Sequence, residues 1–320
     1  MMFGLDFSFP SLAGRCGTNV VASYNFASGT FPAGLSFARA STGVCVADNK
    51  LFATAADDAP RFDHGLNTGA ALGLLIESTA TNMVRYSNTL TSWYTSPNAS
   101  IAYASAVGAL KLYAIKRLSG GSVQDRAYSA PITTSSAVTY AVSLLVGRGN
   151  GGVSRVSLEN ASRAIWAFDI NWPSDTSLSV TNINTAVASG AASINGLTVE
   201  PITTNVHRIT FTFTADESAG FNFRIQPDRS AADSANLFGA VQIEAGSAAT
   251  SHVVTTSNAA TRAADIARIT TLANGTYDVR VVANGVTTDL TGVTVSGAYW
   301  PAAGTGRVKA ITIFTHGMMS

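Results

Sequence analysis

The chain has 320 residues, of which 46% are hydrophobic and only 12% are charged, and its formal net charge is +1. Soluble proteins carry about 25% charged residues, so this surface must consist largely of Ser, Thr, Asn, Ala and Gly. A net charge this small gives no field that would attract nucleic acid or an anionic membrane, and we expect neither as a partner. The length allows two or three domains.

The N-terminal stretch MMFGLDFSFPSLAGR lacks the basic start and continuous apolar core of a signal peptide, and we expect none. No apolar run approaches the ~18 residues of a membrane span. Cys16 and Cys45 either form a disulfide or are two small buried thiols, and the second alternative is favoured. Neither cysteine has a His at ligand spacing, so the sequence predicts no metal site and no cofactor.

Residues 38–64, ARASTGVCVADNKLFATAADDAPRFDH, predict a strand, a turn and a second short strand. Three carboxylates, Asp57, Asp58 and Asp63, cluster around Pro60. Carboxylate oxygens can bind calcium, but the DxDxDG type of spacing is missing. We therefore expect a solvated turn here.

The stretch VTYAVSLLV, residues 138–146, alternates apolar and other side chains, as a half-buried strand does. Gly147, Gly149 and Gly152 follow it with the spacing GxGxxG. A dinucleotide site needs a helix after such a loop, but the next residues, VSRVSL, are typical of a strand. The sequence predicts a glycine-rich hairpin loop that binds no nucleotide.

An aromatic cluster follows in AIWAFDINWP, residues 164–173. In a strand, Trp166, Phe168, Ile170 and Trp172 share one face. Aromatic side chains on a sheet face either stack on sugar rings or form the core of a sandwich. We favour the core, which makes the opposite, polar face the candidate for ligand binding.

The alternation continues in HRITFTFTADE (207–217), GFNFRIQP (220–227) and LFGAVQIEAG (237–246), which predicts antiparallel strands. The apolar faces of these strands are predicted to form the core between two sheets. They carry Trp166, Phe168, Ile170, Phe211, Phe213, Phe221, Phe223 and Ile243. The polar parity, a candidate glycan-binding face, contains Asp169, Asn171, Arg224, Gln226, Gln242 and Glu244. These groups both donate and accept hydrogen bonds, as sugar hydroxyls require. Phe238 has the parity of an aromatic platform, with Tyr128 or Trp93 approaching from a loop. The alternative is that this face meets solvent or a neighbouring subunit.

After the polar connector TSNAATRAAD, residues 266–320 form a small tail in which Asn284-Gly285 predicts a hairpin turn. The boundaries predicted are therefore a β-unit at 1–88, a sandwich at 89–250, and a connector with a second β-unit at 251–320. GxSxG, HExxH and P-loop motifs are missing. We expect His64, His207, His252 and His316 to be loop or strand-end residues, no catalytic residue, and no enzyme.

Two segments resemble motifs of tailed-phage and prophage virion proteins. In residues 35–88 these are FARAST (37–42), PRFD (60–63), GLLIE (73–77) and Thr81-Asn82. In residues 237–265, LFGAVQIEAGSAATSHVVTTSNAATRAAD is similar to the "GAQLEAG…TSY-PT…TRAAD" ending of that family. The chain departs from the pattern at His252-Val253, where the family usually has an aromatic residue.

The resemblance implies an all-β fold in which the two motifs bracket a jelly-roll domain similar to carbohydrate-binding modules. It implies a structural protein of a tail fibre, tail tip or head fibre, located in the virion, whose jelly roll binds a glycan or host surface. Other virion proteins are the expected partners, and a homo-oligomer, preferably a trimer, is the expected assembly. Two alternatives stay open: an assembly or decoration protein that binds no sugar, and a polysaccharide-degrading tailspike, which the lack of a repeat disfavours.

Overall fold

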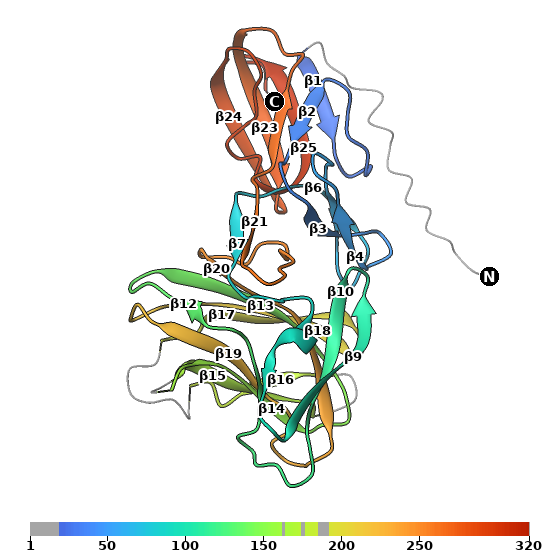
Figure 1. The fold of residues 1–320 in the computed structure, drawn as a ribbon. Helices are drawn as coiled ribbons and strands as arrows, with labels where there is room; N and C mark the ends of the chain where they lie inside the picture. The colour runs from blue at the N-terminus through green and yellow to red at the C-terminus, as the bar shows by residue number, and fades with distance from the viewer. Residues whose placement is uncertain (1–18, 162–163, 174–176, 185–191, 320) are drawn as a thin grey trace, which may run out of the picture.

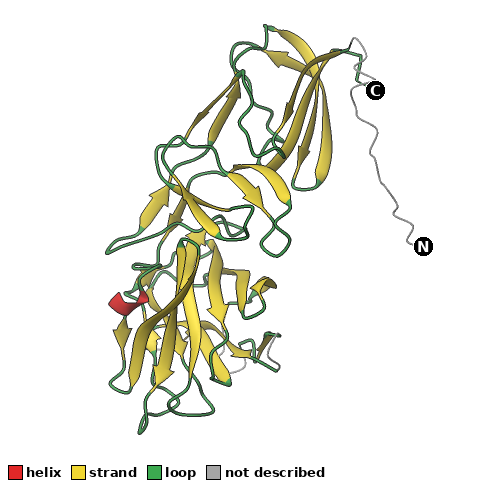
Figure 2. Cartoon of the chain, turned by 90° about the vertical axis from the view of Figure 1, so that its right-hand side faces the viewer, coloured by secondary structure: helices red, strands yellow, loops and turns green. Residues whose placement is uncertain are grey.

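The protein is all-β, as predicted, and elongated in the computed structural model (Figure 1). The structure describes residues 19–161, 164–173, 177–184 and 192–319. Strands and loops account for these ranges apart from one turn of 3-10 helix, η2 (Leu90–Ser92) (Figure 2). Within the same ranges, no helix is long and apolar enough to span a membrane.

A two-sheet sandwich forms one end of the molecule. The sheet nearer β1 (Val20–Asn25) and β25 (Gly306–Thr315), here called the near sheet, has the order β17 (Asn195–Thr203), β18 (Val206–Thr214), β13 (Thr139–Gly147), β20 (Ala235–Ala245), β10 (Leu110–Arg117) and β9 (Ala99–Val107). The opposite sheet, here called the far sheet, has the order β16 (Ser179–Thr181), β15 (Ala164–Asn171), β14 (Val153–Glu159), β19 (Gly220–Gln226), β11 (Ala127–Tyr128) and β8 (Tyr94–Thr95), and β12 (Ile132–Thr133) also pairs with β19. The strand pairings described for both sheets are antiparallel.

The sandwich core is the one that strand parity predicts. All eight predicted residues belong to its main apolar cluster, and none is more than 2% exposed. Trp166 lies at the centre, with its ring 4.9 Å from that of Phe211 in an edge-to-face arrangement. Rings from β15, β18 and β19 therefore interlock across the gap between the two sheets.

The glycine-rich loop is not a hairpin. It carries the chain from β13 in the near sheet to β14 in the far sheet, so the strands on its two sides do not pair. Gly149 passes so close to the neighbouring chain that a Cβ there would lie 1.9 Å from the Ala235 carbonyl oxygen. The glycines thus permit close packing of two backbone segments, and a strand follows them.

The two terminal segments, predicted as separate units, form one sheet. Its order is β24 (Val286–Val295), β23 (Gly275–Ala283), β25 (Gly306–Thr315), β6 (Ala71–Ile76) and β5 (Phe62–His64), and β1 (Val20–Asn25) also pairs with β25. Asn284 and Gly285 have φ angles of 53° and 77° between β23 and β24, which confirms the predicted turn. This terminal unit has its own apolar core.

Short strands connect the terminal unit to the sandwich. β2 (Leu35–Ala38) pairs with β22 (Ile266–Ile269), and β7 (Ala80–Asn82) pairs with β21 (Ala260–Arg262). The hairpin of β3 (Gly43–Val46) and β4 (Phe52–Ala55) packs its apolar side chains against β10 and β13 of the near sheet. The chain therefore enters and leaves the sandwich at one place, here called the joint (Figure 1).

Candidate functional site

The residues predicted to form one glycan-binding face lie on two separate surfaces. Asp169 and Asn171 are on β15, and Arg224 and Gln226 are on β19, all in the far sheet. Gln242 and Glu244 are on β20 in the near sheet. Because the outer faces of two packed sheets point in opposite directions, these two sets cannot contact one ligand.

On the far sheet the polar groups bind each other. Arg155 Nε donates to Asp169 Oδ1 at 2.7 Å, and Arg229 Nη1 lies 3.1 Å from the same oxygen. Burial acts to raise the pKa of the Asp169 carboxyl, but hydrogen bonds, the first from Arg155, hold it below its usual value. Arg224 forms an ion pair of 2.9 Å with Glu159.

The remaining two far-sheet candidates are also engaged. Gln226 Nε2 donates to Gln124 Oε1 at 2.9 Å, and Asn171 Nδ2 donates to Thr181 Oγ1 at 2.5 Å. The aromatic group next to this set is Tyr128, which stacks on Tyr94 with their ring centroids 5.4 Å apart. Trp93, the other predicted platform, is 6% exposed and belongs to the core.

The predicted parity of Phe238 is wrong for a local reason. The pairing of β13 with β20 shifts between Ser143 and Leu145, and Ala240 has a φ of 46°, so β20 contains a β-bulge. Because of the extra residue, the side chains of β20 that precede the bulge point to the opposite face from the one predicted. Phe238 therefore points into the core, where it is fully buried. Phe238 is therefore not a platform for a sugar.

Gln242 and Glu244 keep their polar parity but are buried, at 0% and 2% exposed. Gln242 Nε2 donates to Glu244 Oε1, and its Oε1 accepts from the Val253 backbone N–H at 2.6 Å. Burial raises the pKa of Glu244 although Thr250 donates two hydrogen bonds to its carboxyl. The two side chains hold the 247–252 loop on the near sheet and do not face solvent.

Five fully or largely buried charged residues meet at the joint: Arg39, Arg61, Glu77, Arg262 and Asp265, here called the buried ion network. Arg61 Nη2 lies 2.5 Å from Asp265 Oδ2 and 2.9 Å from Glu77 Oε2. Arg39 Nη1 lies 3.1 Å from Asp265 Oδ1. Burial acts to raise the pKa of Glu77, but the Arg61 and Arg262 guanidiniums outweigh it and hold this pKa below its usual value.

The three guanidiniums are also held by backbone carbonyl groups. Arg39 donates to the Ala56 oxygen, Arg61 to the Val44 oxygen and Arg262 to the Ser78 oxygen, at 2.6, 2.9 and 2.8 Å. Buried charges are tolerated when they are both paired and hydrogen-bonded, and this network meets both conditions. Its residues come from both the N-terminal and the C-terminal parts of the chain, so the network connects segments that are far apart in the sequence at the joint.

The sequence motifs converge in this network. Arg39 lies in FARAST, Arg61 in PRFD, Glu77 in GLLIE, and Arg262 and Asp265 in TRAAD. From the sequence, these stretches are expected to bracket the jelly roll, and no local pattern assigns a role to their charged residues. The solvated turn predicted around Pro60 is wrong for Asp63, which is 2% exposed and accepts from the Val46 N–H and from Arg307 Nε.

Cys45 lies beside this region and is not fully buried. Burial, together with the nearby Asp63 carboxylate, raises the pKa of its thiol to about 11. Cys16 falls outside the residues that the structure describes, so the favoured alternative of two separate thiols stays a prediction. Within the described ranges, no three His, Cys, Asp or Glu side chains are grouped so that they could hold a metal ion.

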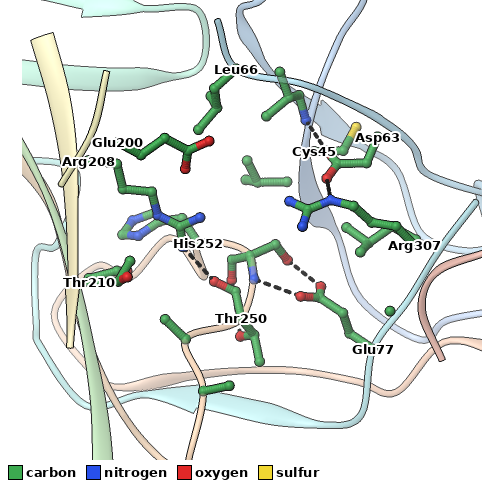
Figure 3. A pocket seen from close by; sticks show the side chains of 18 of the residues that line it. Cys45, Asp63, Leu66, Glu77, Glu200, Arg208, Thr210, Thr250, His252 and Arg307 are labelled. Atoms are coloured by element: carbon green, nitrogen blue, oxygen red, sulfur yellow. Dashed lines mark hydrogen bonds and ion pairs between the residues drawn. The ribbon is translucent and has the colours of Figure 1, made fainter. Parts of the chain in front are cut away.

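A cavity of about 880 Å³ lies between the joint and the near sheet (Figure 3). Glu200, Arg208 and Thr210 line it from β17 and β18, and Arg307 reaches it from the terminal unit. Arg208 Nη2 donates to the Thr250 backbone oxygen at 3.0 Å. Sequence reasoning missed this site, because Arg208 was only one of the polar residues alternating with the apolar ones in β18.

His252 lies in the cavity wall and is 5% exposed. Its Nε2 lies 3.2 Å from Ser87 Oγ, and its Nδ1 has no hydrogen-bond partner among the described residues. Burial, assisted by the charge of Arg208, lowers the pKa of His252 to about 3. The residue at which the chain departs from the motif pattern is thus a buried neutral imidazole.

Acid should therefore destabilise the fold through His252. Below pH 6.5 the unfolded chain binds a proton at this residue and the folded chain does not, until the pH nears 3, so stability falls as the pH falls. Between pH 7.5 and pH 5.5 we expect the wild type to lose about 1.4 kcal/mol more than His252→Gln. Urea unfolding at the two pH values measures this difference, and equal losses in the two proteins would contradict it.

Comparison with known proteins identifies no family: the chain matches neither a family model nor a curated protein.

Proposed function

We propose that this chain is a non-enzymatic structural protein of a tailed-phage virion, a component of a tail or head fibre, whose sandwich domain binds a glycan or the host surface. The supporting observation is the convergence of the resembling motifs in space. Residues from four separate motif segments supply the whole buried ion network, and a fifth motif, Thr81-Asn82 in β7, pairs with the TRAAD segment in β21. The charged residues of the motifs thus form one connected structure, the buried ion network.

A buried ion network at the joint suits a fibre component. A fibre protein is attached to the particle at one end and binds its target at the other. A rigid connection between the two β-units keeps the binding unit in a fixed position relative to the attached unit. The low-charge surface, rich in small polar residues, suits contact with copies of the same chain, and we propose a homotrimer with other virion proteins as neighbours.

A second candidate is an assembly or decoration protein that binds no sugar. It is favoured by the polar face of the far sheet, where Asp169, Arg224 and Gln226 are bonded to neighbouring side chains. Groups engaged in this way give a sugar little to bind, whereas a packed surface suits a neighbouring subunit.

Purified particles of the encoding phage test the proposal. We expect mass spectrometry to find the chain in multiple copies per particle and labelled antibodies to mark the tail or a head fibre. Purified protein, labelled with a fluorophore, should bind host cells if it is a receptor-binding fibre, and should bind particles but not cells if it is a decoration protein. Absence of the chain from washed particles would refute both candidates.

A further inference from the structure

An arginine side chain that lines the cavity between the joint and the near sheet has few bonded partners. The Arg208 guanidinium reaches into the cavity and, among the described residues, forms no ion pair; one hydrogen bond, to the Thr250 carbonyl, is its observed contact (Figure 3). Burial lowers the pKa of Arg208 against the opposing effect of Glu200. Glu200 lies opposite Arg208 in the β17–β18 pairing but forms no described ion pair with it, so this partly buried charge is only partly compensated, and an anionic ligand would reduce the remaining cost.

A second guanidinium faces the same space. Arg307 donates through Nε to Asp63 at 2.6 Å, and the other end of its guanidinium points into the cavity toward Arg208 (Figure 3). Its side chain is 44% exposed, so this end is accessible. Two guanidiniums on opposite walls match a carboxylate, because each presents a fork of N–H donors.

The remaining walls favour a singly charged ligand with hydroxyl groups. Glu200 lies beside Arg208, and its carboxylate accepts hydrogen bonds from hydroxyls but repels a multiply charged anion such as phosphate (Figure 3). Thr210 offers a hydroxyl that donates or accepts, and Leu66 offers an apolar surface. The volume, about 880 Å³, lies in the range of small-molecule sites.

We propose that this cavity binds the carboxylate of an acidic sugar, with Arg208 and Arg307 holding the carboxylate and Glu200 and Thr210 binding hydroxyl groups. The inference deepens the proposed function, because it assigns glycan binding to the joint and not to the outer face of the sandwich. It also names the substrate class: a uronic acid or a sialic acid, both of which combine one carboxylate with a ring of hydroxyls.

Calorimetric titration of the full chain tests this inference with glucuronate, N-acetylneuraminate, glucose and inorganic phosphate. We expect at least one acidic sugar to bind about tenfold or more tightly than glucose and phosphate, and the preferred acid identifies the source. No binding of either acid at millimolar concentration, or tighter binding of phosphate, would overturn the proposal.

Matched variants locate the site. Arg208→Gln should weaken acidic-sugar binding about tenfold or more, and Arg208→Lys, which keeps the charge but not the fork, should weaken it less. Arg280→Gln removes the same charge from β23, where Arg280 pairs with Asp289 outside the cavity, and should leave the affinity unchanged. Circular dichroism confirms that each variant is folded. Equal affinity of wild type and a folded Arg208→Gln would show that the sugar binds elsewhere, even if the chain is found in the virion.

Discussion

Truncation of Arg61 to Ala is expected to lower the free energy of unfolding by about 3–5 kcal/mol, as breaking a buried ion pair does. Arg61 is fully buried and pairs with both carboxylates of the buried ion network. Its loss leaves Asp265 and Glu77 with less compensation in a largely buried region, and it also removes the donor to the Val44 carbonyl. The cost arises from these groups left behind, not from the lost attraction alone.

Urea unfolding followed by circular dichroism measures this loss. Arg280→Ala is the control, because it removes an arginine from the partly exposed pair with Asp289, and it should leave the midpoint almost unchanged. Arg61→Lys keeps the charge without the planar fork and should fall between the two. If the network holds the two β-units together, Arg61→Ala should also separate unfolding into two transitions. An Arg61→Ala midpoint equal to that of Arg280→Ala would mean that the network does not stabilise the joint.

Truncation of Trp166 to Ala should cost about 3–5 kcal/mol through the cavity it leaves. The ring is fully buried and contacts Phe168, Phe211, Phe213 and Phe223, with ring centroids 4.9 to 6.0 Å apart. No single neighbour can move to fill the space, because these rings come from three strands in two sheets.

Two further variants complete the comparison: one that keeps most of the Trp166 ring without its N–H, and a control at an exposed tyrosine. Trp166→Phe should cost much less than Trp166→Ala, since it keeps most of the ring and removes an indole N–H that has no hydrogen-bond partner among the described residues. Tyr94→Ala is the control, because Tyr94 is 57% exposed at the edge of the far sheet and should affect stability little. Thermal unfolding of the three variants under one condition gives the comparison. If Trp166→Ala were silent, the inner and outer faces of β15 would be assigned the wrong way round.

The sequence by itself determined the clearly alternating strands, the aromatic centre of the sandwich core and one turn. Alternation identifies a strand because successive side chains point to opposite faces, and this geometry depends only on adjacent residues. It therefore placed Trp166, Phe211 and Phe223 in the core, where the structure has them. The Asn284-Gly285 turn was equally local, since two residues with positive φ are enough to form it.

Only the tertiary structure decided features that depend on distant partners. The bulge at Ala240 moved Phe238 into the core, because the extra residue appears only when β20 is aligned with β13. Strands from the two terminal segments form one sheet because β1 pairs with β25, close to the other end of the chain. Arg39 and Asp265 are 226 positions apart, so no local pattern could pair them. Charge pairing, strand pairing and cavities form between segments that folding brings together, whereas periodicity reports only on neighbours along the chain.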